Sequence, residues 1–131
     1  MSRVLVTGGA GFMGSQLVRS LAETGRDVVV FDKLTYAGNQ AFLEGVPHTF
    51  VLGDVCDEDA VRRVMVDVDA VVHMAAESHV ARSLTGPDAF IQTNVVGTRV
   101  MLDSACRAGV DRFIHISTDE VFGQAPHGVA F

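Results

Sequence analysis

The chain has 131 residues, of which 48% are hydrophobic, and its formal net charge is −6 at neutral pH. This length suffices for one domain and this hydrophobic content for a buried core, which excludes a disordered chain. The acidic balance excludes a nucleic-acid backbone as the expected partner. No apolar run approaches the ~20 residues of a membrane span and no signal-peptide pattern is present, so we expect a cytoplasmic protein that makes no membrane contact.

The first motif is a glycine loop at the N-terminus. Residues 3–7 form a short aliphatic run that predicts a buried parallel strand. Three spaced glycines follow, and a helical pattern then covers residues 15–24. Glycines let the backbone approach a pyrophosphate closely, and the helix N-terminus directs free N–H groups at that anion. This context predicts a dinucleotide-binding loop, with an ordinary glycine-rich turn as the alternative.

The second predicted strand, residues 27–31, ends at Asp32. A carboxylate at this distance from the glycines accepts hydrogen bonds from the adenosine ribose of NAD and repels the 2′-phosphate of NADP. We therefore expect NAD, although the adjacent Lys33 weakens this inference and a solvated turn acid is the alternative for Asp32. A short third strand over 49–52 leads to Asp54, which either contacts the adenine amino group or caps the next helix.

The remaining elements alternate in the same way. Residues 58–66 predict a helix, 69–74 a strand, 88–108 a long helix and 111–116 a fifth strand. Asn94 and Gly97 interrupt the apolar face of the long helix and indicate close contact with a neighbouring element or ligand. The pattern predicts an α/β fold of the Rossmann type, with a doubly wound parallel sheet in the strand order 3-2-1-4-5. We treat residues 1–131 as one NAD-binding domain, with the ligand at the carboxyl ends of the strands.

Cysteines and histidines do not indicate a metal site. Cys56 and Cys106 lie far apart, which is neither a disulfide framework nor a metal-binding spacing. His73 and His79 have no third ligand at a suitable spacing. We expect a half-buried strand histidine at position 73, a loop histidine at position 79, and no metal.

These residues resemble the extended short-chain dehydrogenase/reductases, and most closely the dTDP-glucose 4,6-dehydratases. The resemblance covers the whole chain. The matching segments are Thr-Gly-Gly-Ala-Gly-Phe-Met-Gly at 7–14, Asp-Lys-Leu-Thr-Tyr-Ala-Gly-Asn at 32–39, Gly-Asp-Val at 53–55, Ala-Ala-Glu-Ser-His-Val at 75–80, Thr-Asn-Val-x-Gly-Thr at 93–98 and Ser-Thr-Asp-Glu-Val-Phe-Gly at 117–123.

The resemblance implies a lyase that uses NAD to convert a nucleotide-activated glucose, dTDP-glucose, into its 4-keto-6-deoxy sugar. It implies contacts with the sugar substrate from Ser78, His79 and Thr118. The cofactor would be bound by Gly8, Gly11, Phe12, Met13, Gly14, Asp32, Lys33, Leu34, Thr35, Gly38, Asp54, Val55, Met74, Ala75, Ala76, Ser78, Thr93 and Ser117. The long helix resembles the one that packs across the dimer interface in this family, so a homodimer is expected by analogy.

For catalysis, the resemblance implies that Thr118 binds the sugar O4, that Asp119 protonates the leaving C6 hydroxyl, and that Glu120 removes the C5 proton. Paired carboxylates in different protonation states suit this elimination. A helix-capping box formed by Ser117 and Glu120 is the alternative for these residues. Ala81 departs from the family pattern, because it stands where an Asp is usual.

The larger departure is that the Tyr-x-x-x-Lys motif of the redox step is absent from these 131 residues. The only Tyr is Tyr36 and the only Lys is Lys33, both on the adenosine side. We expect a domain that stops before the last strands and the substrate domain, and a chain that cannot turn over by itself. Two alternatives are a nucleotide-sugar epimerase or decarboxylase of the same superfamily, which would lack Asp119 and Glu120, and a non-catalytic NAD-binding module.

Overall fold

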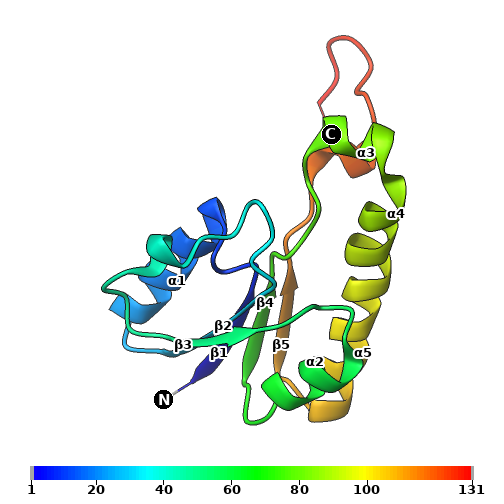
Figure 1. The fold of residues 1–131 in the computed structure, drawn as a ribbon. Coiled ribbons are helices and arrows are strands. Elements are labelled where there is room, and N and C mark those ends of the chain that lie inside the picture. Colours follow the sequence, from blue (N-terminus) through cyan, green and yellow to red (C-terminus); the bar gives the residue numbers. More distant parts are fainter. Residues whose placement is uncertain (1, 131) are drawn as a thin grey trace.

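The sheet has five parallel strands in the predicted order. The computed structural model describes residues 2–130, so Met1 and Phe131, the two ends of the predicted domain, lie outside the described residues. The sheet order is β3-β2-β1-β4-β5, which confirms the prediction (Figure 1). The strands are β1 (Arg3–Thr7), β2 (Asp27–Asp32), β3 (Thr49–Leu52), β4 (Ala70–His73) and β5 (Arg112–His115).

Helices cover both faces of this sheet (Figure 1). The α1 helix and the short η1 helix lie on one face, and α2 packs with α5 on the other. The helical elements are α1 (Phe12–Glu23), η1 (Gln40–Leu43), α2 (Glu58–Val64), α3 (Val80–Thr85), α4 (Pro87–Phe90), η2 (Ile91–Gly97), α5 (Thr98–Ala108) and η3 (Asp119–Phe122). In the part of the chain described, no helix is long and apolar enough to cross a membrane.

The alternation of side chains along the strands produces two cores. On β1, Leu5 enters the core beneath α2 and α5, whereas Val4 and Val6 enter the core beneath α1. Successive residues of a strand point to opposite faces, so a continuous aliphatic run can fill both sides of a doubly covered sheet. Both cores reach the carboxyl edge of the sheet through loop residues, Val55 in one and Ala10 in the other.

Three predicted helices are wrong in their boundaries. The helix predicted over 58–66 ends at Val64, and the other two differ more. The α1 helix begins at Phe12, inside the glycine motif, and not at Ser15. The single helix predicted over 88–108 is divided, because η2 is π-helical between α4 and α5. The short α3 helix was not predicted at all. Its six residues contain no buried side chain, so they carry no hydrophobic periodicity from which to predict it.

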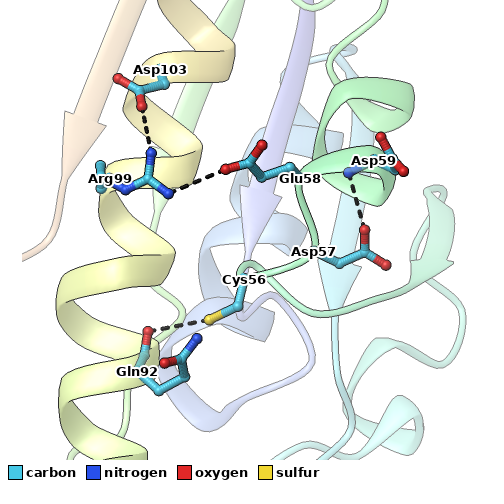
Figure 2. Close-up of polar contacts among 7 residues, drawn as sticks. All are labelled: Cys56, Asp57, Glu58, Asp59, Gln92, Arg99 and Asp103. Carbon is cyan, nitrogen blue, oxygen red and sulfur yellow. Dashed lines mark hydrogen bonds and ion pairs between the residues drawn. The ribbon is translucent and has the colours of Figure 1, made fainter.

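Tertiary contacts around Cys56 hold the π-helical segment and the start of α5 against the loop after β3. The Cys56 thiol donates to the Gln92 carbonyl, with 3.2 Å between sulfur and oxygen (Figure 2). A Cβ on Gly97 would lie 2.6 Å from Val55 Cγ2, so only glycine lets the helix approach this closely. Arg99 then joins α5 to α2 through Glu58, at 3.2 Å. The predicted close contact at Gly97 is therefore made with the loop that follows β3.

Candidate functional site

One large cleft lies at the carboxyl ends of the strands, as the topology predicts. Its volume is about 1050 Å³, and residues that follow all five strands contribute to its lining. The loops bring together residues that are far apart in the sequence, from the glycine loop after β1 to the Ser117–Val121 segment after β5. An elongated ligand can therefore lie across the whole sheet edge.

The glycine loop forms a cradle built from backbone. Gly8 has a φ of +70°, and a Cβ there would lie 2.9 Å from the Ala75 backbone. A Cβ on Gly14 would overlap the Gly8 carbonyl. Gly11 caps α1 without any side-chain hydrogen bond, which leaves the first N–H groups of the helix to a ligand. This arrangement fits a pyrophosphate, because it combines close backbone approach with the positive end of a helix dipole.

Asp32 is held at the end of β2 by two backbone donors. Its Oδ2 accepts from the Ala10 N–H at 2.9 Å, and its Oδ1 accepts from the Leu34 N–H at 2.8 Å. Asp32 itself lines the cleft. The carboxylate is therefore fixed in orientation at the edge of the cleft, whereas a solvated turn acid would be free to rotate.

Lys33 and Asp54 form an ion pair beside it. Lys33 Nζ lies 2.6 Å from Asp54 Oδ2, and Asp54 Oδ1 accepts from the Cys56 N–H at 2.9 Å. Partial burial is the largest influence and would raise the pKa of Asp54, but the hydrogen bonds from Lys33 and Cys56 together outweigh it and lower that pKa. The bond to Asp54 also raises the pKa of Lys33. Asp57, and not Asp54, caps α2.

A buried polar group joins β1, β4 and α5 under the middle of the cleft. His73 is 0% exposed, so the prediction of a half-buried histidine is wrong. Its Nδ1 lies 2.7 Å from Thr7 Oγ1, and its Nε2 lies 3.1 Å from Thr98 Oγ1. Burial, with a smaller contribution from the stacked His115, lowers the pKa of His73 to about 4. His73 is therefore a neutral hydrogen-bonding group at physiological pH.

The loop after β4 is tied down by side chains from other elements. Asn94 binds both backbone groups of Glu77: its Oδ1 accepts from the N–H at 2.8 Å, and its Nδ2 donates to the carbonyl at 2.9 Å. The Tyr36 hydroxyl donates to the Glu77 carboxylate at 3.3 Å, and Arg82 lies 4.1 Å above the Tyr36 ring. The predicted contact of Asn94 is thus with the loop that carries Ser78.

The segment after β5 is exposed. Thr118 caps η3, because its hydroxyl oxygen accepts from the Glu120 N–H at 3.3 Å. The same hydroxyl donates to Asp119 Oδ1 at 3.2 Å. The capping residue is Thr118 and not Ser117, so the capping box suggested by the sequence is not formed. Thr118 and Glu120 line the cleft, whereas Asp119 lies outside its lining.

Most of the predicted site residues line this one cleft. Three do not: Leu34, whose backbone binds Asp32, His79, which precedes α3, and Asp119. Those that line it are Gly8, Gly11, Phe12, Met13, Gly14, Asp32, Lys33, Thr35, Gly38, Asp54, Val55, Met74, Ala75, Ala76, Ser78, Thr93, Ser117, Thr118 and Glu120.

Several lining residues were not predicted as site residues. Glu77, Asn94, Thr98 and His115 all contribute to the cleft. Asn94 carried a signal, since a polar residue interrupts an apolar helix face there. Glu77 and Thr98 lie in the segments 75–80 and 93–98 that carry the family resemblance, whereas His115 carried no signal, because a histidine in a strand is ordinary. Among residues 2–130, no three His, Cys, Asp or Glu side chains gather closely enough to hold a metal ion, and Cys56 and Cys106 are free thiols.

Comparisons with known proteins agree with this geometry. The model of the NAD dependent epimerase/dehydratase family matches residues 4–130. The dTDP-glucose 4,6-dehydratase of Streptomyces niveus is 48% identical over 136 residues, which cover 96% of this chain and 40% of that protein. The chain thus spans about 40% of the length of the curated relatives that it matches.

Solved structures with this fold include both dehydratases and epimerases. The dTDP-glucose 4,6-dehydratase of Streptomyces venezuelae, solved with NAD bound, superimposes with a TM-score of 0.91 at 48% identity, over 96% of this chain and 42% of that one. A UDP-glucose 4-epimerase of Thermotoga maritima superimposes with a TM-score of 0.83 at 36% identity, over 88% of this chain and 38% of that one. The fold is therefore shared by proteins with different reactions.

Proposed function

Because the chain belongs to the NAD dependent epimerase/dehydratase family, we propose that it is the NAD-binding part of a lyase that dehydrates a nucleotide-activated glucose. The proposed substrate is dTDP-glucose, and the product is its 4-keto-6-deoxy sugar. The observation that carries the proposal is that Thr118 and Glu120 line the same cleft as the glycine loop and Asp32. A cofactor and a reacting sugar can thus share one cavity.

The cofactor would lie along the carboxyl edge of the sheet. The N–H groups at the start of α1 would bind the pyrophosphate, Asp32 would accept hydrogen bonds from the adenosine ribose, and Asp54 would meet the adenine amino group. Lys33 is paired with Asp54 at 2.6 Å, so it is not free to bind a 2′-phosphate. This pairing supports NAD over NADP.

In the proposed reaction, NAD accepts a hydride from sugar C4 and later returns it to C6. Thr118 would hold O4 by a hydrogen bond. Once C4 is a ketone, Glu120 would remove the acidified C5 proton, and Asp119 would protonate the C6 hydroxyl so that it leaves as water. Asp119 is outside the cleft lining and its carboxylate accepts from Thr118, so it would have to leave Thr118 to reach the sugar.

The proton on O4 needs a further base. The family resemblance assigns it to a Tyr-x-x-x-Lys motif, and Tyr36 and Lys33 are bound to Glu77 and Asp54 on the adenosine side. We therefore propose that the 131-residue chain binds NAD as one incomplete domain without turning over, and that activity needs a longer chain. A cytoplasmic homodimer, with α5 and its preceding turns at the interface, completes the proposal by analogy with the family.

The test is to incubate the chain in its native length with NAD and dTDP-glucose and to analyse the sugar product by mass spectrometry. A dehydratase removes the mass of one water, whereas a 4-epimerase changes the stereochemistry at C4 without changing the mass. The epimerase is the second candidate because the Thermotoga maritima enzyme shares the fold. Binding of NAD without any change in the sugar would favour a non-catalytic module.

A further inference from the structure

Thr7, His73 and Thr98 are joined by hydrogen bonds beneath the cleft, and the donor in each bond can be worked out from the neighbouring groups. The Thr7 hydroxyl is fully buried, and its oxygen accepts from the N–H groups of Met74, at 3.2 Å, and Ala75, at 3.1 Å. A hydroxyl has one proton and two acceptor positions. The Met74 N–H is shared with the Thr7 carbonyl, also at 3.2 Å. Neither N–H can accept a proton, so the hydroxyl proton goes to the remaining neighbour, His73 Nδ1, at 2.7 Å.

This donation decides the tautomer of His73. A neutral imidazole has one protonated and one unprotonated nitrogen. Because Nδ1 accepts from Thr7, the proton of the ring is on Nε2 and points at Thr98 Oγ1, 3.1 Å away. The Thr98 oxygen is therefore an acceptor in this bond. The Thr98 hydroxyl proton is left over: in the part of the chain described, the hydroxyl oxygen bonds His73, while the Thr98 backbone N–H donates to the Val95 carbonyl.

Thr98 lines the cleft on the side of β4 and β5, together with Met74, Ala75 and His115. Asp32 and Asp54 lie on the opposite side, after β2 and β3. A dinucleotide that places its adenosine at the β2–β3 side extends its nicotinamide half toward β4 and β5. A hydroxyl donor on that side therefore faces ribose and phosphate oxygens of the nicotinamide half.

We propose that His73 is a positioning residue locked as the Nε2–H tautomer, and that it directs the Thr98 hydroxyl proton into the cleft as a donor to an oxygen of the nicotinamide half of NAD. The proposal rests on the NAD-binding function proposed above, but the tautomer does not. His115, stacked on His73 with 5.4 Å between ring centroids, is the titratable group that faces it from β5. Thr7, His73 and Thr98 form a buried relay, and its Thr7 hydroxyl also holds Met74 and Ala75 beside the glycine loop.

The first test is the tautomer itself. NMR of the chain in its native length, labelled with ¹⁵N in its histidines, should show His73 at neutral pH with Nε2 protonated and Nδ1 unprotonated. A fold that merely tolerates a buried histidine does not dictate which nitrogen carries the proton. A protonated Nδ1, or fast exchange between the tautomers, would overturn the proposal.

The second test compares two ligands and two substitutions at one position. Thr98→Val should weaken NAD binding about three- to tenfold, which is the usual effect of one lost neutral hydrogen bond. Thr98→Ser, which keeps the hydroxyl, should stay within about twofold of the wild type. AMP lacks the nicotinamide half, so its affinity should not respond to either change. Ser104→Ala, on the same helix but outside the cleft lining, is the matched control.

Unchanged NAD affinity in Thr98→Val, or an equal loss of AMP affinity, would overturn the assignment of Thr98. If Thr98→Val does not fold, because His73 loses its acceptor, the wild type decides the question. NAD, but not AMP, should then shift the His73 Nε2–H resonance, and an unshifted resonance would contradict the proposal. A wild type that does not bind NAD would refute the proposed function and would leave the tautomer result standing.

Discussion

The two sides of the cleft are held in different ways. On the side of β1 and β2, buried strands, a backbone cradle and the doubly bonded Asp32 leave little freedom before a ligand arrives. On the side of β5, the strand is mostly exposed, and Thr118 and Glu120 follow it on a single 3₁₀ turn without buried residues. The side of β1 and β2 is thus preorganised by packing. The segment after β5 is held by the Ile116 N–H, which donates to the His73 carbonyl at 3.0 Å, and by the hydrogen bonds of the turn at Thr118. Substitutions on the side of β1 and β2 should therefore lower the stability of the fold, whereas substitutions on the side of β5 should lower activity with little effect on stability.

The largest effect is expected in the backbone cradle. Gly14→Ala should lower the free energy of unfolding by about 3 kcal/mol, because the added Cβ meets the Gly8 carbonyl and neither backbone segment can yield. NAD binding should be lost with it. Urea unfolding and calorimetric titration measure the two effects. Gly86→Ala is the control: its Cβ would meet nothing closer than 3.8 Å, and its stability should stay within about 0.5 kcal/mol of the wild type.

The next effect concerns the buried relay. The pKa of His73 is about 4 in the folded chain and 6.5 for an ordinary histidine. Between these two pKa values, His73 binds a proton in the unfolded state but not in the folded state. The contribution of the neutral His73 to the free energy of unfolding is therefore complete above pH 6.5 and is lost as the pH falls through 4. The loss should reach about 3 kcal/mol.

Urea unfolding at a series of pH values measures this slope. His73→Gln should flatten it between pH 6.5 and 4, whereas replacement of the exposed His127 by Gln should preserve it. An unchanged slope in His73→Gln would mean that other groups produce the acid sensitivity.

A smaller effect is expected at Asp32. Asp32→Ala leaves the N–H groups of Ala10 and Leu34 without their acceptor, which should cost about 2 kcal/mol of stability and weaken NAD binding more than tenfold. Asp27→Ala, at the other end of β2, removes a half-exposed ion pair with Arg3 and should cost less than about 1 kcal/mol. Equal losses of stability and of NAD affinity in the two variants would show that Asp32 neither holds the loop nor binds the cofactor.

The smallest effect on stability is expected on the exposed side. Glu120→Gln should change the free energy of unfolding by no more than about 0.5 kcal/mol, because the side chain is exposed and packs in neither core. Turnover of the native-length chain should nevertheless fall about 10²- to 10⁴-fold, as expected for the loss of a general base. Glu44→Gln is the surface control. Full activity in Glu120→Gln would contradict the proposed mechanism.

Much of the architecture followed from local patterns. The five strands and their order were predictable, because short aliphatic runs that alternate with helices permit few right-handed parallel arrangements. The place of the cleft followed from that order. The boundaries of α1 were less predictable: the glycine motif itself enters the helix at Phe12, and propensity alone does not favour a helix through Gly14.

By itself, the sequence determined the sheet, the glycine loop and the acidic residues at the strand ends, because spacing and periodicity along the chain encode them. Tertiary structure alone decided the close approach of Gly97, at the end of the π-helical turn, to Val55, and the burial of His73 between Thr7 and Thr98. Such contacts join residues from separate elements, and no local pattern records which distant group will complete a hydrogen bond.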